Sequence, residues 1–218
     1  AYFSTGTTPL MRASKFDNRD MIELLLQRGA NVAATQPDGT TALMLASGVK
    51  YTITQEGDPE KAGTPDDAYE IARMLVERGA DVNAKDDLQD SAFLFAGAQG
   101  RLEILRMTLR AGADLQSTNR YGGTALIPAC HYGHLETVKV LLGTAIDVNH
   151  VNRLGWTALL EAVILGDGGP THAEIVRLLL ARCADPNVAD REGVSPLAHA
   201  KRRGYAAMSK LISAAGGR

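Results

Sequence analysis

The sequence predicts an all-α solenoid of about six helix–turn–helix repeats joined by β-hairpin-like loops. Two motifs recur in phase along the 218 residues, and aromatic residues make up only 5% of the chain. A single globular core of this size normally uses more large rings, whereas thin stacked layers of Leu, Ala and Val need fewer. A repeated architecture is therefore expected over the whole chain.

The first motif is a Thr or Ser followed by Pro or Ala and then a large apolar residue. Its copies begin at Thr8, Thr41, Ser91, Thr124, Thr157 and Ser195. Successive copies are 33, 50, 33, 33 and 38 residues apart. A Thr or Ser hydroxyl can cap the first turn of a helix, and Pro suits the first helical position. Each copy is therefore predicted to begin the first helix of a repeat.

The second motif follows the apolar second helix of a repeat and contains an acidic or amide residue. That residue is Asn31, Asp81, Asp114, Asp147 or Asp185. The gaps between these positions are 50, 33, 33 and 38 residues. Both motifs thus give a period of 33 residues, with additional residues inserted in the second and fifth repeats.

Glycines are expected at the turns between elements. Four of them, predicted to reverse the chain between two helices in a left-handed conformation, are Gly100, Gly133, Gly166 and Gly204. Dipeptides that suit hairpin turns are Asp38-Gly39, Tyr121-Gly122, Leu154-Gly155 and Glu192-Gly193. Gln89 stands where the third hairpin should have its glycine, so that hairpin is expected to be irregular.

These motifs and their period resemble the ankyrin repeat over almost the whole chain. The family's His after Thr-Pro-Leu is absent, its place being taken by Met11, Met44, Leu94, Ile127, Leu160 and Ala198. The segment Leu-Gly-Asp-Gly-Gly-Pro-Thr-His at 165–172 is similar to that of stand-alone bacterial ankyrin-repeat proteins.

The resemblance implies one ankyrin-repeat domain over residues 1–218. The expected repeats span about 3–35, 36–85, 86–118, 119–151, 152–189 and 190–218, the last being a C-terminal cap. Residues 50–66 contain two prolines and many polar residues, which predicts a long loop between the two helices of the second repeat. A shorter insertion is expected at about 167–171.

Charge and hydropathy narrow the classes of function. The formal net charge is −2 with acids and bases interspersed, which argues against a general nucleic-acid binder. No apolar run approaches the roughly 20 residues of a membrane helix, so we expect a soluble monomer without membrane insertion. No signal peptide is visible, but the chain begins with Ala, which is compatible with a processed start; cytoplasm and periplasm both stay open.

No group of residues predicts catalysis, a metal or a cofactor. Neighbouring helix positions point about 100° apart, so Cys130 and His131 cannot form a catalytic pair, and Cys130 is expected to be a packed thiol. The i, i+3 spacing of His131 and His134 could hold a metal. However, His134 and His172 match the family's Gly-His turn, which implies a structural role. The Gly-rich segment 166–170 lacks the Lys of a phosphate loop.

A candidate partner site comes from position within the repeat. In ankyrin-type repeats, hairpin tips and exposed first-helix residues line the concave face, and Tyr, Trp and Arg are the types that most often anchor interfaces. The fourth and fifth repeats concentrate such residues, although scattered surface side chains would need no explanation. The candidate partner-binding residues are Arg120, Tyr121, His131, Tyr132, Arg153, Leu154, Trp156, Ile164 and Leu165.

The sequence thus predicts a protein–protein interaction module or adaptor, not an enzyme, that binds an unidentified protein on its concave face. Two alternatives stay open. The chain could be a substrate-recruiting or regulatory segment of a larger enzyme, or it could bind a small ligand or metal at the 166–172 loop.

Overall fold

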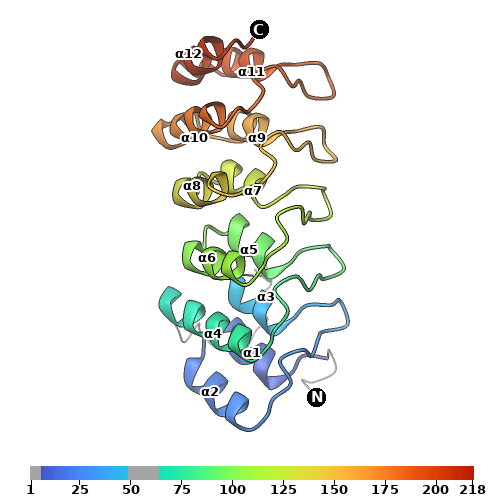
Figure 1. The fold of residues 1–218 in the computed structure, drawn as a ribbon. Helices are drawn as coiled ribbons and strands as arrows, with labels where there is room; N and C mark the ends of the chain where they lie inside the picture. Colours follow the sequence, from blue (N-terminus) through green and yellow to red (C-terminus); the bar gives the residue numbers. More distant parts are fainter. Residues whose placement is uncertain (1–5, 49–63) are drawn as a thin grey trace, which may run out of the picture. The chain divides into compact units, whose positions relative to one another are not determined.

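A computed structural model describes residues 6–48 and 64–218. Over this part of the chain it contains twelve α-helices and no strand, apart from an isolated bridge between Thr35 and Thr41 (Figure 1). The all-α repeat architecture is confirmed. The chain forms two compact blocks: an N-terminal block, Ala1–Ala96 with Arg101–Asp114, and a C-terminal block, Gly97–Gly100 with Leu115–Arg218.

The N-terminal block pairs its helices as the repeat predicts. It holds α1 (Pro9–Lys15), α2 (Arg19–Gln27), α3 (Ala42–Ser47), α4 (Pro65–Glu77), α6 (Leu102–Arg110) and most of α5 (Ala92–Ala98). In this block α1 packs against α2 and α3, and α4 packs against α2, α3 and α6. The predicted loop insertion at 50–66 lies between α3 and α4, and most of it (residues 49–63) lies outside the described residues.

The C-terminal block stacks its helices in two layers (Figure 1). It holds α7 (Leu126–His131), α8 (Leu135–Leu142), α9 (Ala158–Ile164), α10 (Pro170–Ala181), α11 (Pro196–Arg202) and α12 (Ala206–Ala214). The first helices α7, α9 and α11 pack side by side, and the second helices α8, α10 and α12 form the other layer. Leu126, Leu141 and Leu159 are buried in this block. No helix in the described residues is both long and apolar enough to cross a membrane.

The hydroxyl caps predicted from the first motif form in five of the six copies. For example, Thr8 Oγ1 accepts a hydrogen bond from Met11 N–H at 3.2 Å, and Thr157 Oγ1 accepts one from Leu160 N–H at 3.2 Å. Equivalent bonds occur at Thr41, Ser91 and Ser195. Thr124 is the exception, because its carbonyl oxygen accepts from Ile127 N–H while its buried hydroxyl has no partner.

An Asx residue organises each hairpin of the C-terminal block. At Asn152, the carbonyl oxygen accepts from Gly155 N–H, and the side-chain Oδ1 accepts from the N–H groups of Leu154 and Trp156. Asn119 and Asp190 make the same three contacts in their hairpins. A side-chain oxygen that binds backbone two residues ahead stabilises a tight turn, so these positions hold the hairpin tips in place.

The third hairpin is not irregular, and the expectation drawn from Gln89 is wrong. Gln89 N–H donates to Asp86 O at 2.8 Å, as Gly122 N–H donates to Asn119 O at 2.8 Å in the next hairpin. Gln89 adopts the left-handed conformation of the missing glycine, with φ 63°. The two side-chain bonds of Asp86 to Leu88 and Asp90 maintain the turn and offset the strain in Gln89.

We expect Gln89→Gly to raise the free energy of unfolding by about 1 kcal/mol, because glycine adopts a left-handed φ without the Cβ clash. Urea denaturation would measure the difference. Leu88→Gly in the same hairpin serves as the control and is expected to destabilise, since this substitution adds only unfolded-state entropy. Stabilisation by both substitutions, or by neither, would contradict the assignment of strain to Gln89.

Asparagines after the second helices link neighbouring repeats. Asn149 Nδ2 donates to Cys183 O at 3.2 Å, and Asn149 Oδ1 accepts from Asp185 N–H at 2.8 Å. Asn83 makes the same pair of bonds in the N-terminal block, to Gly112 O and Asp114 N–H. The Asn of the second motif therefore recurs because it joins one repeat to the next.

Candidate partner-binding site

The predicted hairpin residues form one connected group. Arg120 and Tyr121 lie at the tip of the fourth hairpin, where the guanidinium carbon of Arg120 lies 4.7 Å from the centre of the Tyr121 ring. Arg153, at the tip of the next hairpin, donates its N–H to Tyr121 O at 2.7 Å and its Nη1 to Arg120 O at 3.0 Å. Leu154 beside it is exposed. The structure thus brings four of the nine candidate residues together on two adjacent tips.

A second group lies at the C-terminal end of α7. His131 and Tyr132 stack, with ring centres 4.2 Å apart and an interplanar angle of 13°. Tyr132 is 59% exposed, more than any other large hydrophobic side chain in the described residues. A stacked and exposed aromatic pair presents a rigid apolar surface, which is the type of group that anchors interfaces.

The remaining three candidates contribute unequally to the surface. Trp156 is half-buried, and its backbone closes the fifth hairpin through bonds in both directions with Asn152. At the end of α9, Ile164 is half-buried and Leu165 is 41% exposed. Trp156 therefore has a packing role that Tyr121 and Tyr132, both exposed, do not have.

Glu161 is a residue of this region that the sequence analysis did not select. It lies on α9 and is only 6% exposed. One carboxylate oxygen lies 3.4 Å from Asn152 Nδ2, at the base of a hairpin, and the other lies 3.8 Å from His131 Nδ1. Glu161 therefore contacts both the hairpin base and the stacked pair on α7. The signal was present, because the same position in the motif is apolar in the second, third and fourth repeats.

Burial changes the acid–base behaviour of this contact. It raises the pKa of Glu161 to about 7, with the Asn152 bond opposing the change. Burial and the neighbouring His172 lower the pKa of His131. At neutral pH the imidazole of His131 is therefore uncharged and Glu161 is partly protonated, so their contact is not a pair of full opposite charges.

The other candidate chemical groups have structural partners. Cys130 is fully buried, and burial raises the pKa of its thiol, which makes it an unreactive packed side chain as expected. His134 Nε2 lies 3.1 Å from Ala98 O, and His172 Nε2 lies 2.9 Å from His131 O. These contacts agree with the structural role predicted for both histidines, which join one repeat to the preceding one. His131 and His134 have different partners and do not converge on a metal position.

The 166–172 loop is held by its own polar groups. Asp167 Oδ1 contacts His172 Nδ1 and Gly169 N–H, both at 2.8 Å, and Gly166 O accepts from the Tyr205 hydroxyl at 3.0 Å. One expectation is corrected here: the left-handed residue is Gly168, at φ 74°, and not Gly166. The insertion moves the reversal two residues along the chain. In the described residues no group of three or more His, Cys, Asp or Glu is placed to hold a metal.

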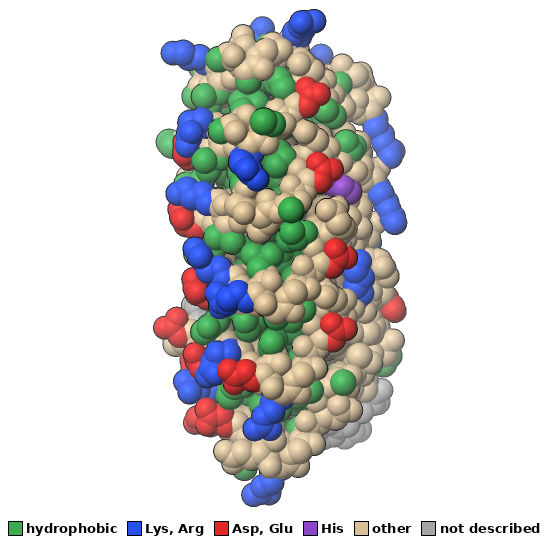
Figure 2. All heavy atoms as spheres, in the orientation of Figure 1, with side chains coloured by type: hydrophobic (Ala, Val, Ile, Leu, Met, Phe, Trp, Pro, Cys, Tyr) green, Lys and Arg blue, Asp and Glu red, His purple; other side chains and the backbone are tan. Residues whose placement is uncertain are grey.

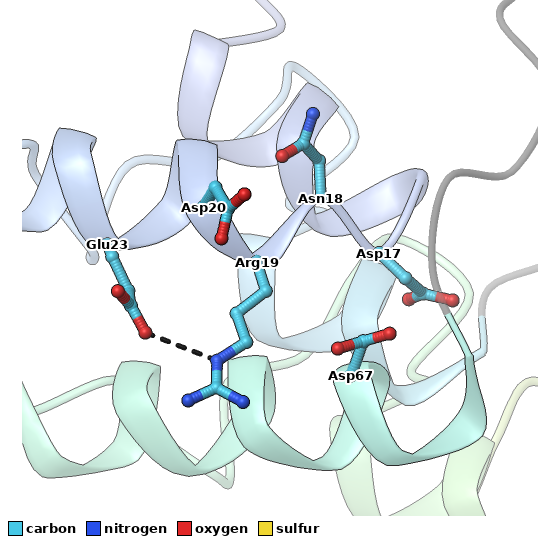
Figure 3. A pocket seen from close by; sticks show the side chains of 6 residues that line it. All are labelled: Asp17, Asn18, Arg19, Asp20, Glu23 and Asp67. Carbon is cyan, nitrogen blue, oxygen red and sulfur yellow. Dashed lines mark hydrogen bonds and ion pairs between the residues drawn. The ribbon is translucent and has the colours of Figure 1, made fainter.

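An acidic hollow of about 620 Å³ lies between α2 and α4 in the N-terminal block (Figure 3). Its lining residues are Asp17, Asn18, Arg19, Asp20, Glu23 and Asp67. Arg19 Nε donates to Glu23 at 3.2 Å across an exposed helix face, and the Thr64 cap lowers the pKa of Asp67. This hollow is open, polar and mostly engaged in local bonds, so we do not assign it a ligand.

Comparison with known proteins identifies the repeat. The model of ankyrin repeats (3 copies) matches residues 2–86 and 92–190. An ankyrin repeat domain from Acinetobacter baumannii AYE is 50% identical, with a TM-score of 0.82, over 96% of this chain and 98% of that chain. A second ankyrin repeat protein, EF0377, is 35% identical, with a TM-score of 0.80, over 95% and 97% of the two chains.

A shorter match involves an Escherichia coli (strain K12) protein, YahD, which is named as an ankyrin repeat protein. The two sequences are 43% identical over 56 residues, which is 26% of this chain and 28% of YahD. This match spans little of either protein, whereas the family model and the two solved structures cover most of the chain. The resemblance to bacterial ankyrin-repeat proteins is confirmed, and the chain belongs to the ankyrin repeat family.

Proposed function

We propose that this chain is an adaptor that binds a partner protein on its concave face, at the hairpin tips and first-helix ends of the fourth and fifth repeats. Ankyrin repeats are generally protein-interaction modules, and their fold is generally a non-catalytic scaffold. The observation that carries the proposal is the exposed stacked pair of His131 and Tyr132, close in the sequence to the linked tips that hold Tyr121.

Three features of the C-terminal block support this surface. Its exposed aromatic side chains are pre-ordered, Tyr121 by Arg120 and Tyr132 by His131, so little rotamer entropy would be lost on binding. The turns that carry them are fixed by Asn119 and Asn152. A rigid surface that combines aromatic rings and arginines is typical of interface hot spots.

We expect Tyr121→Ala and Tyr132→Ala each to weaken partner binding by about 2 kcal/mol, roughly a 30-fold loss of affinity, with little change in melting temperature. The partner would be isolated by affinity capture from the native organism, and its dissociation constant measured by calorimetry. Trp156→Ala is expected to weaken binding as well, but also to lower the melting temperature, because Trp156 is half-buried.

Leu24→Ala is the matched control, since Leu24 is a similarly exposed apolar side chain (44%) on α2 in the other block. It is expected to leave both affinity and stability nearly unchanged. Full affinity in the two tyrosine variants would remove the site from the fourth and fifth repeats.

A further inference from the structure

We infer that Arg120, Arg153 and Arg191 form a row that binds an acidic, extended segment of the partner protein. The inference rests on the proposed function and names the chemistry of the partner at that surface. Each arginine is the first residue after the Asx position of its hairpin, so the three occupy equivalent places on successive tips. We call this set the arginine row.

Backbone contacts fix the arginine row. The guanidinium of Arg153 donates to Arg120 O at 3.0 Å, and that of Arg191 donates to Arg153 O. The stems of Arg153 and Arg191 pass over the turn glycines of the preceding hairpins, where a Cβ would lie 2.9 Å from Arg153 Cγ and 2.7 Å from Arg191 Cγ. The glycines at Gly122 and Gly155 therefore leave room for each stem to lie along its neighbour.

The charges of the arginine row are not compensated within the protein. No carboxylate lies within ion-pair distance of these three guanidinium groups in the described part of the chain. Basic residues of the second helices differ, since Lys139 pairs with Glu136 and Arg177 pairs with Glu174. All three arginines are exposed, and Figure 2 shows Lys and Arg side chains along the edge where Figure 1 places the hairpin loops of the C-terminal block.

Carboxylates fit this arrangement best. A guanidinium that gives one N–H to a carbonyl keeps further donors, which can bind a carboxylate in a forked geometry. Exposed Tyr121 and Leu154 lie beside the arginines and offer apolar contact between the charges. Glu192, next to Arg191, would repel a continuous phosphate backbone more than a peptide that alternates acidic and apolar side chains. We therefore assign the row to a protein segment and not to nucleic acid.

The test uses a fluorescent peptide of alternating Glu and Leu, about 12 residues long, which spans roughly 40 Å when extended and so can cross three hairpins packed about 10 Å apart. Binding to the full chain is expected to be measurable by fluorescence anisotropy at low salt and to weaken as salt rises. Replacing the three arginines together by glutamine is expected to lower the affinity at least tenfold.

The matched control replaces Lys201, Arg202 and Arg203, three exposed basic residues at the end of α11, by glutamine, and it changes the net charge equally. An equal loss of affinity in both triple variants would overturn the inference, because net charge alone would explain it. Tighter binding of a single-stranded oligothymidylate with the same number of charges would also overturn it. If the first triple variant does not fold, Arg120→Gln alone replaces it, since this side chain contacts only Tyr121.

The inference and the proposed function can fail separately. If the arginine variant binds the captured partner and the peptide as well as the unmodified chain does, while the tyrosine variants lose the partner, the site stands and the arginine row is wrong. If the arginine variant loses the peptide while the tyrosine variants keep the partner, the row binds acidic segments and the proposed partner site is wrong.

Discussion

Replacing Gly166 by alanine is expected to lower the free energy of unfolding by about 3 kcal/mol. A Cβ at this position would clash with the carbonyl oxygen of Ala162 and lie 2.7 Å from His172 Cδ2. Neither neighbour can move freely, because Ala162 belongs to α9 and His172 is held by His131 O and Asp167. Urea denaturation of the full chain would measure the loss.

Gly204→Ala is the control for this prediction. Gly204 reverses the chain in the last repeat with φ 71°, and nothing lies within 4 Å of a Cβ there. The substitution introduces only left-handed strain, which costs about 1 kcal/mol. An equal loss in the two variants would mean that conformational strain, and not close packing, determines the need for glycine at Gly166.

Glu161→Gln is expected to stabilise the protein in alkaline solution, by about 3 kcal/mol relative to the effect of the same substitution in acid. The folded carboxyl has a pKa of about 7 against an ordinary value of 4.5, so the folded state retains a proton that the unfolded chain releases between these values. The free energy of unfolding therefore falls as pH rises through this window. Glutamine carries no charge at any pH and removes that penalty.

Urea denaturation of both proteins at about pH 4.5 and about pH 8.5 would measure this difference. Glu136→Gln on α8 is the control, because Glu136 is an exposed carboxylate paired with Lys139, and surface pairs contribute about 1 kcal/mol or less. A pH-independent effect of Glu161→Gln would show that the buried carboxyl is ionised without penalty. His131 is present in both proteins of the pair, so its own titration largely cancels.

Local interactions explain how much of the fold was predictable. Thr8 and Thr157 cap helices through bonds to residues three positions ahead, and the hairpin Asx residues bind backbone two and four positions ahead. Such contacts depend on short spacings that can be read directly, and the 33-residue period then multiplies each of them. The Gly-His role of His134 was also predictable, because the motif itself fixes the turn that carries it.

Contacts between repeats explain what was missed. Glu161 is buried between Asn152 and His131, and no short spacing shows that a charged residue there is enclosed. The irregular turn expected at Gln89 did not occur, because Asp86 supplies bonds that a rule based on glycine alone ignores. The position of the left-handed residue in the fifth repeat depended on how Tyr205 of the next repeat meets Gly166 and Gly168.

The hairpins have a consequence for how such a chain can change its specificity. The bonds that close each turn come from the backbone and from Asn119, Asn152 or Asp190, so the turn itself does not require any particular side chain at the two positions after them. A gene could therefore diversify these codons, repeat by repeat, with little loss of foldability. A combinatorial library randomised only at residues 120–121, 153–154 and 191–192 would sample new recognition surfaces on an unchanged scaffold.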